Sequence, residues 1–153
     1  RQEEGVKTYL IKKILNVLNT KINYYLAALH APVKCTFNEF FEEVITDENN
    51  CERSYFNFSG GERKRIDLAC LFAFMDMKRL QGETVFNTTF YDELLDSSLD
   101  DKGVDMVISL LSERKKKYNE GSYIITHRQQ SVLNHIDCTI NLEKRNGATY
   151  LLK

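Results

Sequence analysis

Two adjacent carboxylates, Asp92 and Glu93, end a β-branched and aromatic run over residues 84–91. Such a run is typical of a buried strand, so the pair is expected where the strand reaches the surface. Neighbouring residues that leave a strand point in different directions, so one carboxylate can hold a divalent cation while the other reaches a water molecule. Phosphoryl transfer needs both of these roles. Taken alone, the pair is more often the start of a solvated loop.

A glycine turn, Ser59-Gly60-Gly61-Glu62, runs directly into a long helical pattern over residues 63–80. Two glycines let the backbone lie against a phosphate, and the start of a helix offers unsatisfied N–H groups and the positive end of a dipole. The alternative is an ordinary helix cap, because serine is a favoured cap residue and Glu62 completes a capping box. On its own the cap is the stronger interpretation, although a cap does not require two glycines.

A histidine, His127, follows the short apolar strand pattern of residues 123–126 and precedes Arg128. A neutral imidazole at this place can donate a hydrogen bond to a phosphate oxygen. A lone histidine is more often structural, and the three histidines of the chain show no metal-ligand spacing.

The elements that must position these residues follow the order strand, helix, strand, helix and closing hairpin. Residues 63–80 are apolar nearly all round, which predicts a buried helix. The other predicted elements of this part are strands over 84–91 and 123–126, helices over 100–117 and 129–135, and strands over 138–142 and 148–152 joined through an Asn-Gly turn. This order predicts an α/β fold with a mostly parallel sheet, whose chemistry sits at the carboxyl ends of the strands.

The first part of the chain predicts an amphipathic helix from Thr8 to His30 that ends before Pro32. One subset of its apolar residues alternates steps of four and three, as in a coiled coil: Ile11, Leu15, Leu18, Ile22, Tyr25 and Leu29. Three heptads are few, so an ordinary surface helix is a slightly stronger alternative. A half-buried strand over residues 33–37 and a loop or short hairpin over residues 42–52 follow.

The bulk properties exclude several classes of protein. A chain of 153 residues that is 42% hydrophobic suits one domain with a real core. Its 21 basic and 22 acidic residues give a net charge of −1, so any DNA contact must come from a local patch. The run from Arg114 to Lys117 is a candidate patch, although cations at a helix end are more often simply solvated. No apolar run is long enough for a bilayer, and the four scattered cysteines are expected to be reduced thiols of an intracellular protein.

In their order and spacing, these segments together resemble the C-terminal half of an ABC ATPase head. The signature motif, Walker B motif, D-loop and H-loop of that family match residues 58–65, 90–93, 97–100 and 124–128. The set covers roughly residues 55–130 and is far more specific than any of its members. The resemblance implies a C-terminal ATPase lobe, with ATP and Mg²⁺ as cofactors.

The resemblance also implies which residues act on the nucleotide of the same head. Asp92 would hold Mg²⁺ through water, and Glu93 would polarise the attacking water. His127 would contact the γ-phosphate.

A second group of residues would act across an interface between two heads, so a second copy of the head is an implied partner. The segment Ser59-Gly60-Gly61-Glu62 would close over ATP held on the opposing head. Ser98 and Asp100 would stand at the interface itself.

Two departures from transporter ATPases favour the SMC-like branch of the family. Glu62 stands where transporters usually have Gln, and residues 94–96 add one residue before the D-loop. This form is similar to phage recombination-endonuclease ATPase subunits, relatives of bacterial SbcC. The resemblance implies DNA and a metal-dependent nuclease subunit as partners, and no membrane partner. Three alternatives remain: a transporter ATPase, an SMC-type DNA-tethering protein or a non-catalytic interaction fragment.

A P-loop, GxxxxGK[ST], is absent from the sequence. In SMC-like proteins that motif lies on an N-terminal lobe, which is therefore an implied partner from the same protein. We expect this chain to be a fragment, with the end of a coiled-coil or amphipathic helix over residues 1–31 and the C-terminal lobe over residues 32–153. Without the nucleotide cradle, the isolated chain is predicted to hydrolyse no ATP.

Overall fold

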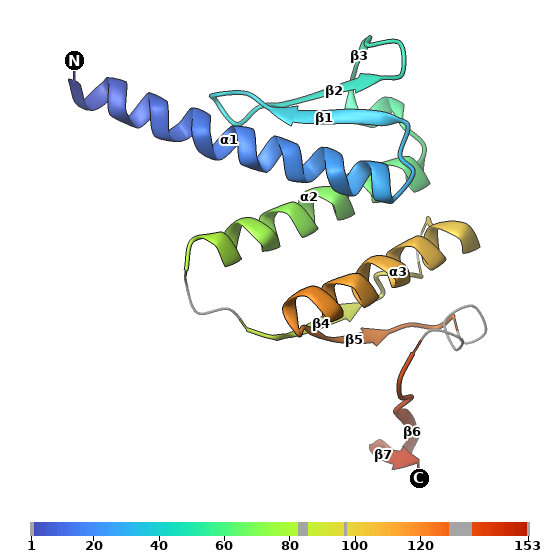
Figure 1. The fold of residues 1–153 in the computed structure, drawn as a ribbon. Helices are drawn as coiled ribbons and strands as arrows, with labels where there is room; N and C mark the ends of the chain where they lie inside the picture. Colours follow the sequence, from blue (N-terminus) through green and yellow to red (C-terminus); the bar gives the residue numbers. More distant parts are fainter. Residues whose placement is uncertain (1, 83–85, 97, 129–135, 153) are drawn as a thin grey trace.

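The computed structural model describes residues 2–82, 86–96, 98–128 and 136–152, and Figure 1 shows their arrangement. The elements in chain order are α1 (Gln2–Ala28), β1 (Val33–Phe37), β2 (Glu43–Asp47), β3 (Glu52–Arg53), the 3-10 helix η1 (Tyr55–Asn57), α2 (Gly60–Leu80), β4 (Thr88–Asp92), α3 (Asp101–Tyr118), β5 (Gly121–Ile125), β6 (Asn141–Arg145) and β7 (Ala148–Leu152). The helix expected over residues 129–135 lies outside the described residues.

The strands form three small sheets within the described ranges. β4 and β5 pair in parallel, whereas β1, β2 and β3 pair antiparallel and so do β6 and β7. The expected mixture of helices and strands is confirmed, but parallel pairing is limited to β4 and β5. The connections explain this limit, because α3 crosses from β4 to β5 while short turns join the antiparallel pairs.

Helix α1 has two apolar faces with different surroundings. The residues with coiled-coil spacing are buried from Leu15 onward: Leu15, Leu18, Ile22, Tyr25 and Leu29. This face packs against α2 and belongs to the domain core. A different set of α1 side chains is exposed: Val6, Leu10, Ile14, Val17 and Tyr24. The heptad-like subset is thus the core face of this helix, which spacing alone cannot distinguish from a coiled-coil seam because both use steps of three and four.

Two asparagines of α1 hold the edge of β1. Asn19 accepts a hydrogen bond from the backbone N–H of Phe37 at 2.8 Å and donates to its carbonyl at 3.0 Å. Asn23 makes the same pair of bonds with Cys35, at 3.2 and 2.8 Å. Their spacing of four residues places both on one face of the helix, so each side-chain amide replaces a neighbouring strand.

Helix α2 is confirmed, but one of its sides is partly open. Ala69 and Phe72 have no exposed surface, whereas Leu71 is 41% and Phe74 45% exposed. The prediction of burial all round is therefore wrong. An apolar composition shows that a helix can be buried, but neighbours decide how much of its circumference they cover.

The closing hairpin has the turn that its sequence predicts. Asn146 and Gly147 lie between β6 and β7 with φ values of 47° and 83°, and Arg145 pairs with Ala148 across the turn. Positive φ at both turn residues is the reason for Asn-Gly at this place. Strand β6 begins at Asn141 rather than at residue 138.

A network of charged side chains is buried between the helices. Arg114 on α3 pairs with Asp76 of α2 at 2.7 Å and with Glu120 at 3.1 Å, and none of the three is more than 3% exposed. Lys21 of α1 adds a bond to Asp76 at 3.0 Å, and Arg79 adds one to Glu120 at 2.9 Å. The network therefore joins α1, α2 and α3 to the residue that precedes β5.

This burial corrects the suggested DNA patch at residues 114–117. Arg114 is committed to the network, so it is not available to DNA. Lys115, Lys116 and Lys117 are exposed, and Lys115 pairs with Asp137 at 2.7 Å.

Candidate functional site

The acidic pair and His127 meet at one edge of the parallel pair β4–β5. Asp92, the last residue of β4, is in register with Ile125, the last residue of β5. The backbone N–H of Glu93 donates to the Ile125 carbonyl at 3.0 Å, and His127 follows two residues later. All three side chains are exposed, so carboxylates and an imidazole are available at the strand ends where α/β folds hold ligands.

The chain turns sharply as soon as it leaves β4. Glu93 has a φ of 51°, in the left-handed region that non-glycine residues rarely adopt. Leu94 and Leu95 directly after it are 8% and 0% exposed and belong to the core. These two buried leucines hold the backbone of the acidic pair in place, so the unusual conformation of Glu93 is fixed by its neighbours.

Asp96 links the residues after β4 to the residues after β5. Its Oδ1 accepts the hydroxyl of Thr126, and its two oxygens accept the backbone N–H of His127 at 3.0 and 3.1 Å. Partial burial works to raise the pKa of Asp96, but these hydrogen bonds outweigh it and hold the pKa below its ordinary value. The carboxylate therefore stays ionised at neutral pH.

Arg128, which follows β5, makes a second connection to the residues that follow β4. Its Nη2 donates to the carbonyl of Leu99 at 2.6 Å, and its Nη1 lies 3.5 Å from Asp101. Its backbone N–H donates to the Thr126 hydroxyl at 3.1 Å. The H-loop and the D-loop are thus joined by side chains from both sides.

The start of α2 is capped as its sequence predicts. The Ser59 Oγ accepts the backbone N–H of Glu62 at 3.4 Å, and the Glu62 carboxylate accepts the N–H of Ser59 at 2.8 Å. The Ser59 hydroxyl also donates to that carboxylate at 2.7 Å. These bonds lower the pKa of Glu62. The capping box is confirmed, but it leaves the two glycines unexplained.

The D-loop explains Gly61 and lies close to Gly60. A Cβ on Gly61 would lie 2.8 Å from the carbonyl oxygen of Ser98, and one on Gly60 would lie 3.2 Å from the Ser98 hydroxyl. Ser98 is itself held with a φ of 61°. At position 61 only glycine lets α2 approach the D-loop backbone this closely, whereas a Cβ at position 60 would require the Ser98 side chain to move.

Asp100 has two partners within this lobe. It caps α3 by accepting the N–H of Gly103 at 2.9 Å, and it pairs with Arg65 of α2 at 2.9 Å. The hydrogen bond from Gly103, aided by Arg65, keeps the pKa of Asp100 below its ordinary value. A second link therefore joins α2 to the D-loop.

The structure thus brings the predicted site residues into two groups joined by contacts of Asp96 and residues 98–101. Asp92, Glu93 and His127 form the group at the strand ends, and the segment 59–62 forms the other with the D-loop. Sequence reasoning missed Asp96 and Arg128 as connectors. In the sequence they are an aspartate before the D-loop and an arginine after the H-loop histidine. That pattern does not predict a contact until the fold places the two loops together.

One face of the β4–β5 pair is apolar and exposed. Phe90 is 69%, Tyr123 48% and Ile125 55% exposed, and the rings of Phe90 and Tyr123 stack with their centroids 4.8 Å apart. In the described part of the chain α3 contacts β5, and the apolar side chains named above stay exposed although Figure 1 shows the β6–β7 hairpin below the pair. Parallel strands are normally covered on both faces, so this surface is incomplete.

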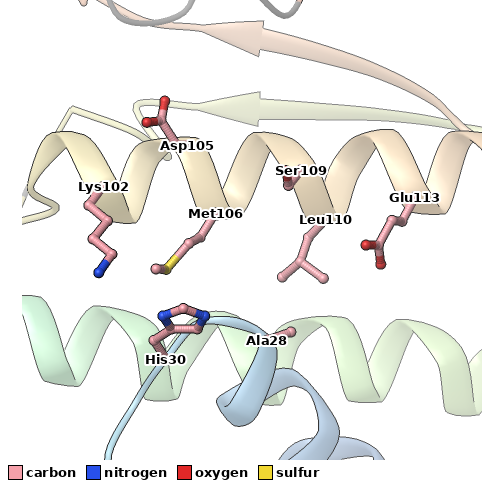
Figure 2. Close-up of a pocket in the computed structure, with 8 residues that line it drawn as sticks. All are labelled: Ala28, His30, Lys102, Asp105, Met106, Ser109, Leu110 and Glu113. Atoms are coloured by element: carbon pink, nitrogen blue, oxygen red, sulfur yellow. The ribbon is translucent and has the colours of Figure 1, made fainter.

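A groove lies away from the strand ends, between the end of α1 and α3. Figure 2 shows Met106 and Leu110 of α3 pointing toward Ala28 and His30. The groove has a volume of about 400 Å³. None of the predicted site residues lines it, so it is separate from the candidate site.

Comparison with known proteins gives two phage relatives along most of the chain. The exonuclease subunits 2 of Enterobacteria phage T4 and Escherichia phage RB69 are each 33% identical over 127 residues, which are 83% of this chain. This chain spans about a fifth of the length of those proteins, since the match covers 22% of each. An energy-coupling factor transporter ATP-binding protein of Spiroplasma kunkelii is 30% identical over 106 residues, 69% of this chain and 31% of that protein. No family model matches the chain.

Solved structures of SMC heads share the fold. The head of the Pyrococcus yayanosii Smc protein, with a coiled coil and joint, matches with a TM-score of 0.75 and 20% identity over 97% of this chain and 29% of that chain. The SMC head domain of Thermotoga maritima matches with a TM-score of 0.65 and 25% identity over 95% of this chain and 51% of that chain. The arrangement of helices and strands described above is thus the one found in these heads.

Proposed function

Because this chain is the C-terminal lobe of an SMC-like ABC ATPase head of the phage exonuclease-subunit type, we propose that it is half of an ATP-hydrolysing subunit of a nuclease complex that repairs or recombines DNA ends. The observation that carries this proposal is the meeting of Asp92, Glu93 and His127 at one edge of a parallel strand pair. The subunit works inside the cell, where ATP is available.

The residues at the strand ends suit the nucleotide of the same head. Asp92 would hold Mg²⁺, Glu93 would position and deprotonate the attacking water, and His127 would contact the γ-phosphate. When bound, Mg²⁺ neutralises charge on the phosphates. Within the described ranges no three carboxylates, histidines or cysteines gather into a cage. One or two carboxylates and the substrate phosphates commonly hold Mg²⁺ together, and Asp92 and Glu93 offer such carboxylates.

The start of α2 suits the nucleotide of a second head. The unsatisfied N–H groups of a helix N-terminus attract phosphate, and residues 59–62 place such a terminus beside Ser98 and Asp100. ATP sandwiched between two copies of the head then brings this clamp onto the γ-phosphate in trans. Closing and opening of the two heads controls the access of DNA and nuclease.

The exposed apolar face of β4–β5 is assigned to the N-terminal lobe of the same protein. Phe90, Tyr123 and Ile125 offer that lobe a surface to cover, as a parallel sheet requires. The lobe also supplies the P-loop that this sequence lacks. The chain by itself therefore binds ATP poorly and hydrolyses none.

Steady-state ATP hydrolysis by the full-length subunit tests the proposed chemistry. Replacing a general base typically lowers the rate by about 10²–10⁴-fold, so we expect Glu93→Gln to lower kcat by at least about 100-fold. The control is Glu113→Gln, an exposed carboxylate on α3. Turnover by Glu93→Gln at the rate of the control would contradict the assignment.

A transporter ATPase is the second candidate, since a transporter ATP-binding protein is among the relatives. The described residues contain no helix long and apolar enough to cross a bilayer. Affinity purification of the full-length subunit from its native cell separates the candidates. A nuclease subunit that copurifies in stoichiometric amount supports the proposal, and a membrane subunit supports the transporter. Recovery of neither kind of subunit supports a DNA-tethering protein.

A further inference from the structure

We propose that Asp96 and Arg128 are positioning residues that lock the D-loop and the H-loop into one unit and so hold His127 in place for hydrolysis. This inference rests on the proposed function, because it concerns the residue assigned to the γ-phosphate. Neither side chain needs to touch the nucleotide.

Asp96 fixes the backbone from which His127 projects. A residue just beyond a strand has lost its ladder hydrogen bonds, so its backbone is free to move unless something else binds it. Here both carboxylate oxygens accept the N–H of His127, and the Thr126 hydroxyl donates to the same carboxylate. Hydrogen bonds to an ionised acceptor are about twice as strong as neutral ones. The short hydrogen-bonded turn from Glu93 to Asp96, with Leu94 and Leu95 in the core, keeps the carboxylate itself still.

Arg128 closes the same junction from the other side. Its guanidinium donates to the carbonyl of Leu99, a residue only 3% exposed, so the arginine is anchored to a buried part of the D-loop. Bonds that cross a gap in both directions prevent the two loops from sliding apart.

The unit extends to the residues assigned to the second head. Ser98 lies against Gly60 and Gly61, and Asp100 pairs with Arg65. A change in position of His127 is therefore transmitted to the start of α2 through the contacts of Asp96, Arg128, Ser98 and Asp100. Misplacement of a catalytic group by about 1 Å can cost roughly 100-fold in rate, so a rigid junction has a direct catalytic value.

The test uses the full-length subunit with Asp96→Asn. Asparagine has nearly the same shape, but its NH₂ group faces donors and it carries no charge. We expect kcat to fall by about 10- to 100-fold, KM for ATP to change less than about threefold, and hydrogen exchange at the backbone amides of His127 and Arg128 to speed up by at least about tenfold. Asp105→Asn, the same substitution at an exposed position on α3, is expected to change neither reading.

A second pair of variants separates positioning from folding. Thr126→Val removes the hydroxyl that donates to Asp96 and should lower kcat severalfold. Thr126→Ser restores that hydroxyl and should recover most of the rate, with circular dichroism showing that both variants are folded. Unchanged amide exchange in Asp96→Asn overturns the lock. Faster exchange with unchanged kcat overturns its catalytic role. If the wild-type subunit hydrolyses no ATP, the proposed function fails, while amide exchange still tests the lock.

Discussion

The buried charge network gives the sharpest stability prediction. Arg114→Met keeps an unbranched chain of similar length but removes the cation shared by Asp76 and Glu120. Removing one partner of a buried ion pair costs about 3–5 kcal/mol, and we expect about 3 kcal/mol because Lys21 and Arg79 still pair with the carboxylates. At roughly 2–4 °C per kcal/mol, the melting temperature of the chain should fall by about 6–12 °C in thermal unfolding followed by circular dichroism.

The neighbouring Lys115→Met is the matched control. Lys115 and its partner Asp137 are both exposed, so this loss should cost less than about 1 kcal/mol.

The pH dependence of the stability has a defined sign. The pKa of Asp76 lies below its ordinary value of 3.8, so its ion pairs stabilise the fold above that pH and the gain is lost as the pH falls through the folded pKa. The difference in melting temperature between wild type and Arg114→Met should have its full size at pH 7 and become smaller below about pH 4. Equal melting temperatures for the two variants at pH 7 would refute the reasoning.

Two further substitutions test local contacts by thermal unfolding. Gly61→Ala should lower the free energy of unfolding by about 1–3 kcal/mol, because its Cβ meets the Ser98 carbonyl at 2.8 Å. The control Gly5→Ala, in open space on α1, should be neutral or stabilising. Equal effects of the two substitutions would refute the close approach. Asn23→Ala should lower the free energy of unfolding by about 1–3 kcal/mol and speed amide exchange at Cys35. The exposed Asn16→Ala should do neither. Unchanged exchange in Asn23→Ala would show that Asn23 does not hold β1.

Periodicity and turn chemistry predicted most elements correctly. The helices, the β6–β7 turn and the capping box at Ser59 follow from local patterns, because each depends on residues close in sequence. Burial was predicted less well. The face of α1 that spacing offered to a coiled coil lies in the core, and α2 keeps an open side, since only the packed neighbours decide which face is covered.

The candidate site divides in the same way. Motif order placed Asp92, Glu93 and His127 at neighbouring strand ends, and the structure has them there. From the sequence, Asp96 was noticed only as part of an insertion before the D-loop, although its carboxylate binds Thr126, which lies 30 residues away. The buried Arg114 looked like part of a basic run for the same reason: long-range partners leave no local pattern.

The central claim is that this lobe supplies the catalytic carboxylate and lacks the nucleotide cradle. The most direct test measures ATP turnover by the chain alone and by the chain coexpressed with the segment of its own protein that carries the P-loop. We predict no turnover by the chain alone, turnover by the assembled head, and at least a roughly 100-fold loss when the chain carries Glu93→Gln. Turnover by the chain alone, or an assembled head that ignores Glu93→Gln, would contradict the account.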